Sequence, residues 1–164
     1  MAVENYFTNY GASPGFGEKL EPGRNAFDLC MVAGYATVAA ADDDGSTYLL
    51  IKDVPSSFVP VKAFIECDAI TSGTDYDIGV YDSETGAVVT KDLLVNGQTL
   101  ATASKVLDGL SAVDLADLGA LKSIAELLGL TPSTAKAKYD IVLTGNTVGS
   151  AAGDVRYLLM GLAG

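Results

Sequence analysis

Two short segments, far apart in the chain, have nearly the same pattern, and this pattern most constrains the fold. Tyr76-Asp77-Ile78-Gly79-Val80 is echoed in outline by Tyr139-Asp140-Ile141-Val142-Leu143. In both segments the first, third and fifth residues are apolar, a period of two that places these side chains on one face of a β-strand. We therefore expect two core strands of a β-rich domain, with both tyrosines facing inward.

Further strand-like stretches follow one another at short intervals. They span residues 26–33, 35–41, 47–52, 59–68, 75–81, 87–91, 139–144 and 154–161. The segments 42–46 and 82–86 between them are rich in Asp, Ser, Thr and Gly, the residues that turns favour. Short strands with frequent turns predict a mainly β fold, an antiparallel β-sandwich or barrel of the jelly-roll kind.

Between the two echoed segments the apolar period lengthens to that of an amphipathic helix, which we expect over about residues 112–129. Ser111 three residues ahead of Asp114 resembles a weakened capping box, and Gly129 provides a stop. Gly119 lowers the helix propensity of the first half. One helix, or a helix plus a turn, is thus inserted in the β domain.

The N-terminal segment has a composition that resists regular structure. Glycine and proline are frequent in residues 6–24, and four aromatic residues are interspersed: Tyr6, Phe7, Tyr10 and Phe16. Exposing four aromatic side chains to water is costly. The segment is either a loop wrapped over its own domain or an arm that contacts a neighbouring subunit or partner. We expect an extended arm at 1–24 and a single β-sandwich domain at 25–164.

The charge of the chain argues against several functions. Its formal net charge is −11, and it contains no histidine. Such a surface repels phosphate backbones, so we expect no direct binding to nucleic acid. Without histidine the chain lacks the commonest general base and the commonest zinc ligand. We expect a protein that is not an enzyme and that has no cofactor.

Two motif matches are weak. Asp42, Asp44, Ser46 and Asp53 have a spacing similar to that of a calcium-binding loop, but Thr47 stands where that loop needs glycine. A solvated acidic hairpin tip is the better interpretation, and no metal site is expected. The segment 15–17 begins a dinucleotide fingerprint that residue 20 does not continue, so this match is attributed to chance.

The paired carboxylates of Asp75 and Asp77 lie two residues apart on one expected strand. This spacing most simply places both side chains on the polar face of that strand.

The two cysteines are expected to be free thiols. Alternation places Cys67 toward the core, whereas Cys30 shares a face with Asp28 and is predicted on the polar side. Free thiols fit a reducing cytoplasm. The first residues show no secretory signal, and the longest apolar stretch, residues 31–41, is about half a membrane span. We therefore expect a protein without membrane association.

The last expected strand is apolar on both faces. Tyr157-Leu158-Leu159-Met160 has no polar residue, so both sides should be covered, the second by the helix or by another subunit. Tyr157 and Leu159 are the candidates for a subunit interface. A hydrophobic content of 49% also indicates that part of the surface is covered in a homo-oligomer.

Two longer stretches show a family resemblance. Residues 69–81, and residues 126–130 together with 139–154, resemble small proteins encoded beside the major capsid protein of tailed bacteriophages. These proteins are described as capsid decoration, cement or head-fibre proteins. The matching motifs are structural and include no catalytic residues.

The resemblance implies a non-enzymatic virion protein, made in the host cytoplasm, that binds the major capsid protein on the capsid exterior, commonly as a trimer. On this hypothesis Tyr6, Phe7, Tyr10 and Phe16 are anchors that contact the capsid. The alternative is a head-fibre adhesin that binds a host surface or carbohydrate. A tail-tube or neck component is the third possibility.

Overall fold

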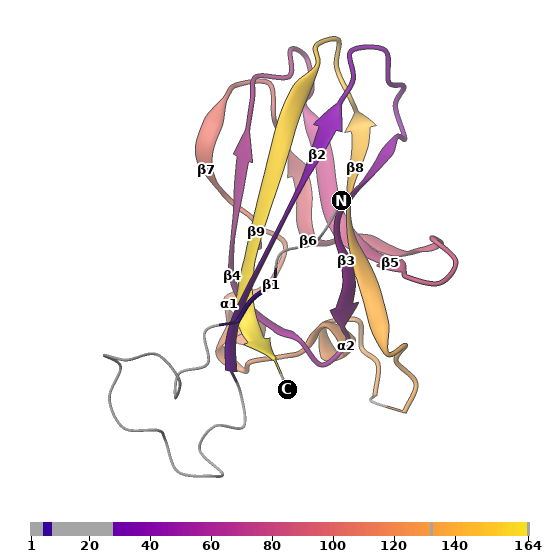
Figure 1. Ribbon diagram of the computed structural model, residues 1–164, viewed down its shortest axis with the longest axis vertical. Helices are drawn as coiled ribbons and strands as arrows, with labels where there is room; N and C mark the ends of the chain where they lie inside the picture. Colours follow the sequence, from indigo (N-terminus) through magenta and orange to yellow (C-terminus); the bar gives the residue numbers. More distant parts are fainter. Residues whose placement is uncertain (1–4, 8–27, 132, 164) are drawn as a thin grey trace.

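The computed structural model describes residues 5–7, 28–131 and 133–163, which build two antiparallel sheets packed face to face (Figure 1). The five-stranded sheet has the order β1 (Asn5–Phe7), β2 (Asp28–Val38), β9 (Gly153–Ala163), β4 (Val59–Cys67) and β7 (Ser104–Asp108). The four-stranded sheet has the order β3 (Thr47–Pro55), β8 (Lys138–Thr147), β5 (Asp75–Asp82) and β6 (Val88–Gln98). The expected β fold is confirmed as a sandwich, and the sheets do not close into a barrel.

The two echoed segments are neighbours in the four-stranded sheet. They form the antiparallel pair β5 and β8, in which Ile78 lies opposite Leu143 and Val80 opposite Ile141. Tyr76 and Tyr139 are 0% and 1% exposed, so both tyrosines face inward as predicted. The repeated alternation therefore indicates two strands that line the same part of the core.

The core between the sheets contains large side chains whose polar atoms are satisfied. The Tyr76 hydroxyl donates to the Val148 carbonyl oxygen at 2.6 Å, and the Tyr157 hydroxyl donates to the Gly109 carbonyl oxygen at 2.8 Å. Burying a hydroxyl without a partner would cost about 1–3 kcal/mol, so these bonds allow tyrosine in the core. Burial raises the pKa of Tyr76 to about 12.

Strand β2 replaces two of the expected strands. The sequence pattern predicts two strands, at residues 26–33 and 35–41, with a break at Gly34. In the structure β2 runs through this glycine. A Cβ atom at Gly34 would lie 1.7 Å from the Leu50 carbonyl oxygen of β3. Glycine is required here because β2 and β3, from different sheets, approach closely, and not because the strand ends.

The helical segment differs from the prediction. Two short helices, α1 (Leu115–Gly119) and α2 (Ile124–Leu127), replace the helix expected at 112–129. The chain turns between them at Leu121, whose φ is 54°. Ile124 and Ala125 of α2 are buried, whereas α1 buries no residue. Gly129, with φ of 70°, follows α2 as expected.

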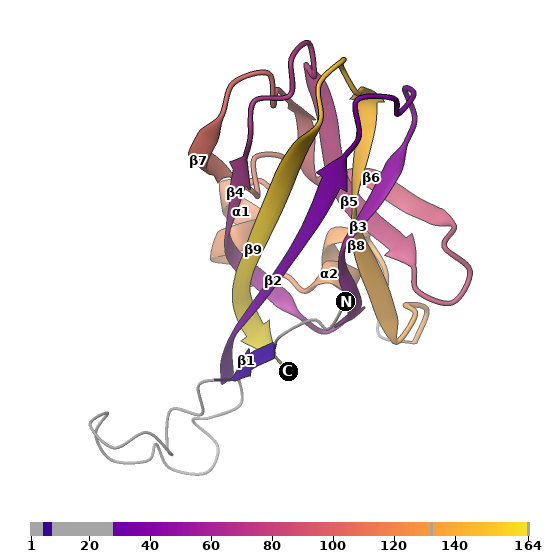
Figure 2. The same cartoon turned by 45° about the horizontal axis from the view of Figure 1, so that its top comes forward.

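The capping box also lies at a different position from the one that the sequence predicts. Ser123 accepts a hydrogen bond from the backbone N–H of Glu126, and the Glu126 side chain accepts one from the Ser123 backbone N–H. Asp114 is the N-cap of α1, without a side-chain capping bond. Figures 1 and 2 place both helices toward the end of the sandwich where β9 finishes. No helix within the described residues is long and apolar enough to cross a membrane.

The two cysteines are both buried, at 4% exposure for Cys30 and 3% for Cys67. The prediction that Cys30 lies on the polar side is therefore wrong. Its backbone lies opposite Gly161 of β9, whereas Cys67 lies opposite Val155, roughly 20 Å away along the same strand. A disulfide needs Cα atoms within about 7 Å, so the two cannot pair within one chain. Burial raises the pKa of both thiols.

Candidate partner-binding surface

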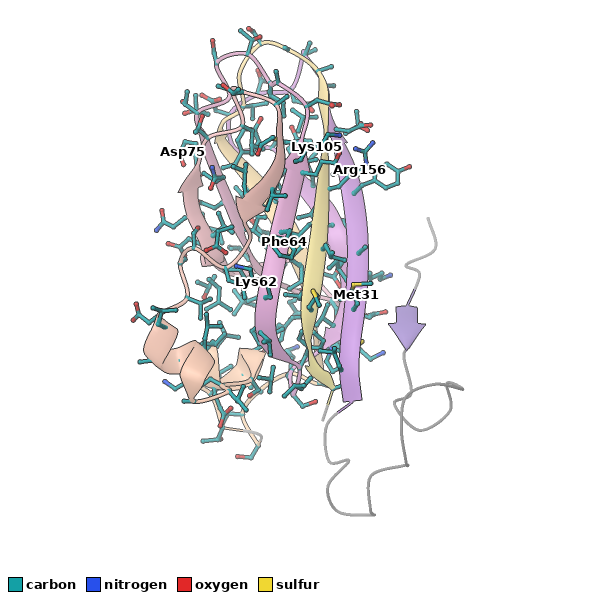
Figure 3. The ribbon with its side chains drawn as sticks, turned by 90° about the vertical axis from the view of Figure 1, so that its left-hand side faces the viewer. Met31, Lys62, Phe64, Asp75, Lys105 and Arg156 are labelled. Carbon is teal, nitrogen blue, oxygen red and sulfur yellow. The ribbon has the colours of Figure 1, made fainter. Side chains whose placement is uncertain are left out.

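The five-stranded sheet has one side against the core and one side toward solvent, which we call the outer face. Along β9 the side chains alternate, with Val155 buried and Arg156 exposed. The same alternation holds for β2 and, apart from one irregularity, for β4. The outer face is formed by Leu29, Met31, Ala33, Tyr35, Thr37, Lys62, Phe64, Glu66, Lys105, Val106, Asp108, Asp154, Arg156, Leu158, Met160 and Leu162 (Figure 3).

The part of the outer face toward the start of β2 is apolar except for Lys62, which lies opposite Met160. Met31 lies directly opposite Met160, and Ala33 lies opposite Leu158, which in turn lies opposite Phe64. Figure 3 looks onto this face and shows Met31 and Phe64 on it. Apolar side chains therefore occupy neighbouring positions on three strands, which is the arrangement of a contact surface and not of scattered single residues.

The part toward the end of β2 carries a connected set of ion pairs. Glu66 Oε1 lies 2.8 Å from the Lys105 ammonium and 3.4 Å from the Arg156 guanidinium. The Arg156 guanidinium also lies 3.8 Å from a carboxylate oxygen of Asp154. The hydrogen bond from Lys105 holds the pKa of Glu66 below its usual value. Outside this set, in the part toward the start of β2, the Lys62 ammonium lies 5.3 Å from the centre of the Phe64 ring.

The two residues expected at a subunit interface are inside the chain. Tyr157 is 1% exposed and Leu159 is 0% exposed, and both pack in the core between the sheets. Their side chains are not available to a second subunit, so this assignment is corrected. The outward side chains of the same run are Leu158 and Met160, both half-buried.

The arm residues proposed as capsid anchors are only partly covered by the structure. Tyr6 and Phe7 belong to β1, where their backbones lie opposite Met31 and Cys30 of β2. Tyr10 and Phe16 lie outside the described residues. The structure thus brings the backbone of β1 to the edge of β2, beside the apolar part of the outer face (Figure 3).

The acidic loop at 42–46 is a connection between the sheets. It joins β2 of one sheet to β3 of the other, so the expected hairpin tip is a corner of the sandwich. A carboxylate oxygen of Asp42 accepts hydrogen bonds from the Ala39 N–H and the Tyr48 hydroxyl, both at 2.8 Å. These bonds, the backbone one first, lower the pKa of Asp42. Asp44 accepts one from the Val148 N–H at 2.9 Å. The carboxylates therefore hold the loop in place.

A second polar cluster lies between β5, β6 and β8. Asp77 is 3% exposed and accepts hydrogen bonds from the Gly97 N–H at 2.8 Å and from the Asn146 amide at 2.6 Å. Lys91 lies 3.4 Å from Asp77 and donates to the Asn146 amide oxygen at 2.7 Å. The same amide donates to Asp75 at 3.1 Å. Asp77 is thus buried in a satisfied network and does not form the solvated polar face that was expected.

A hollow of about 300 Å³ lies near the β5–β6 turn. Asp53, Asp82, Ser83, Glu84, Lys136, Ala137 and Lys138 line it. The Lys136 ammonium lies 3.1 Å from Asp82 and 3.5 Å from Glu84. The lining carries opposite charges that pair with each other, and it includes no aromatic ring on which a sugar could stack.

Comparisons with known proteins bear on the fold. No model of a protein family matches the chain, and neither does any curated protein sequence. A chain of the solved Cyanophage Pam1 capsid asymmetric unit is similar to it in structure, with a TM-score of 0.50 at 14% identity. The similarity covers 93% of this chain and 97% of that chain.

The chain is therefore a two-sheet β-sandwich protein with an apolar, ion-paired outer face. Its fold is shared with a chain of a phage capsid assembly. At this level of identity the similarity concerns the fold alone.

Proposed function

We propose that the protein is a structural component of a phage virion, and specifically a decoration protein that binds the outside of an assembled capsid. The observation that carries this proposal is the similarity in fold to a chain of a capsid assembly, which extends over nearly the whole of both chains. The resemblance of residues 69–81 and 139–154 to capsid decoration proteins supports the same class.

Such a protein stabilises the shell by binding it. A ligand that binds the assembled shell and not its separated subunits shifts the equilibrium toward the assembled state. A sandwich that contacts more than one capsomer adds binding energy only when the capsomers are in place. The decorated shell then resists the pressure of packaged DNA without any covalent step.

The proposed contact to the major capsid protein is the arm at residues 1–24. Aromatic side chains dominate the energetics of many protein interfaces, and the arm contains Tyr6, Phe7, Tyr10 and Phe16. β1 contributes only three residues to the edge of β2. The other strands, β2 to β9, pair with one another without β1, so anchoring through the arm leaves their pairing unchanged.

A deletion of residues 1–17 tests the proposal. We expect the shortened protein to keep its thermal unfolding midpoint and to lose its binding to undecorated phage heads, measured as occupancy by cryo-electron microscopy. A second variant keeps the arm but replaces Tyr6, Phe7, Tyr10 and Phe16 with serine. It should bind as weakly as the deletion if the aromatic side chains are the anchors. Unchanged occupancy of the deletion variant would contradict the proposed role of the arm.

The same preparation separates a decoration protein from an adhesin. A decoration protein saturates heads at a fixed ratio to the major capsid protein, and density at three-fold positions would indicate the proposed trimer. A head-fibre adhesin instead binds host cells or their polysaccharide through its free end. Absence of binding to heads, together with binding to polysaccharide, would overturn the capsid proposal.

A further inference from the structure

The charge of the outer face differs from that of the rest of the molecule. Its cations, Lys62, Lys105 and Arg156, are balanced by Glu66, Asp108 and Asp154. The whole chain has a net charge of −11, so the excess of negative charge lies outside the outer face. Two copies of the chain repel each other in most orientations, and this repulsion is smallest where their outer faces meet.

We infer that the outer face binds a second copy of this chain, by sheet-on-sheet packing centred on Met31, Leu158 and Met160. In this arrangement the neutral faces are in contact and the acidic loops of both copies remain in solvent. Because both copies use the same face, the contact is two-fold and forms a dimer of the free protein, which is distinct from the trimer proposed on the capsid.

The size of the face fits such a contact. Strands β2, β4 and β9 have nine to 11 residues. With a rise of about 3.3 Å per residue and a spacing of about 4.8 Å, they cover together with β7 roughly 500 Å² in projection. Two such faces reach the total of about 1,000 Å² that a specific interface needs. An interface of this size predicts a reversible association that depends on protein concentration.

The chemistry of the face also suits a copy of itself. Two sheets with the same twist pack with their strands nearly aligned, and their side chains interdigitate. Met31 and Met160 lie opposite each other at the centre, and the flexible thioether side chain of methionine adapts to a facing surface. The Lys105–Glu66–Arg156 ion pairs are already complete within one chain. Lys62 lies opposite Met160, and its ammonium lies over the Phe64 ring.

Sedimentation velocity of the full chain over about 1–200 µM tests the inference. We expect association that becomes stronger when NaCl is raised from about 50 to about 500 mM, because salt screens the repulsion between acidic copies and hardly affects apolar contact. Met160→Glu should weaken the association by about tenfold or more, because a desolvated carboxylate is placed at the centre of the contact.

Matched variants make the result specific. Val88→Glu changes a side chain of β6 that is 58% exposed on the other sheet, and it should associate like the unmodified protein. Met160→Leu should also retain association. Thermal unfolding checks that each variant is folded. A protein that stays monomeric under all these conditions, or a Val88→Glu variant that loses association as Met160→Glu does, overturns the inference.

The experiment contains no capsid, so its failure is distinguishable from a failure of the proposed function. If the protein is monomeric but Met160→Glu loses binding to heads, the outer face contacts the capsid and not a second copy.

Discussion

At the scale of single residues, Gly34 is the position where the two sheets leave least space for a side chain. The absence of a side chain there lets the backbone of β2 approach Leu50 of β3. Gly79 is in a similar position, since an added Cβ atom would lie 2.0 Å from the Thr90 carbonyl oxygen. In both cases the neighbour is backbone and cannot rotate away. These glycines determine the distance between strands, a role that composition alone does not reveal.

Gly34→Ala should therefore lower the free energy of unfolding by roughly 2–4 kcal/mol, because the methyl group forces backbone apart in the core. Gly119→Ala is the matched control. Nothing lies within 4 Å of a Cβ atom at Gly119, and alanine favours the helix, so this change should be neutral or stabilising by up to about 1 kcal/mol. Urea denaturation measures both. Equal midpoints for the two variants would contradict the close approach of β2 and β3.

At the scale of elements, α2 connects the helical segment to the sheets. The N–H groups of Ile124 and Ala125 donate to the carbonyl oxygens of Phe58 and Ser56 at the β3–β4 turn. The capping box of Ser123 and Glu126 holds this first turn of the helix. The short helix is thus part of the sandwich, because its free backbone groups bind the turn between two strands.

Ser123→Ala should cost about 1 kcal/mol of stability, because the capping hydrogen bonds of α2 are lost. Ser111→Ala tests the box that the sequence pattern favoured, and it should change stability by less than about 0.5 kcal/mol, as expected for an exposed serine without a cap. Differential scanning calorimetry of both variants compares the two positions. A larger loss in Ser111→Ala would mean that the helix begins where the sequence indicated.

The sequence predicted most strands because each has apolar residues at alternating positions. β7 was missed, since Ser104–Asp108 is a short segment in which only Leu107 packs against the core. The predicted helix is too long because the apolar stripe continues through Leu121, where the backbone turns. Periodicity describes which side chains are apolar, and it does not report a local change of φ.

The candidate surface was harder to predict, for a physical reason. In Tyr157-Leu158-Leu159-Met160 every residue is apolar, so alternation gives no sign of which pair faces the core. A shift of one residue exchanges the two faces of a strand. The prediction placed Tyr157 and Leu159 at an interface, whereas the structure buries them and exposes Leu158 and Met160 in part. Cys30 was placed on the wrong face because Asp28, two residues earlier, was taken to mark the polar face of its strand.

At the scale of the whole molecule, the ionisable groups define a pH range of stability. The pKa values of Asp42, Glu66, Asp82 and Glu126 lie below their usual values because their carboxylates accept hydrogen bonds. Such groups stabilise the folded state above the ordinary carboxyl pKa of about 4, and this contribution is lost as the pH falls through the lower folded value. The chain has no histidine that would titrate near neutrality.

The tyrosines act at the other end of the range. Burial is the largest cause that raises the pKa of Tyr76, to about 12, and it also raises that of Tyr157. A buried tyrosine that stays protonated keeps the fold stable below the ordinary pKa of about 10, and stability falls as the pH rises above that value toward the folded pKa. The expected profile of unfolding midpoint against pH is flat between about pH 5 and 9, with losses on both sides. A steep change near pH 6.5 in a thermal scan would contradict it.

The order of strands has a consequence for the synthesis of the protein. β8 lies between β3 and β5, and β9 lies between β2 and β4, so each sheet contains one of the last two strands in an inner position. The four-stranded sheet is incomplete until β8 has left the ribosome, and the five-stranded sheet is incomplete until β9 has done so. The growing chain must therefore keep the unpaired backbone edges and apolar faces of β1 to β7 out of contact with other chains during translation. Both sheets are completed by pairs of strands that lie far apart in the sequence, and this predicts slow folding that ends after translation does.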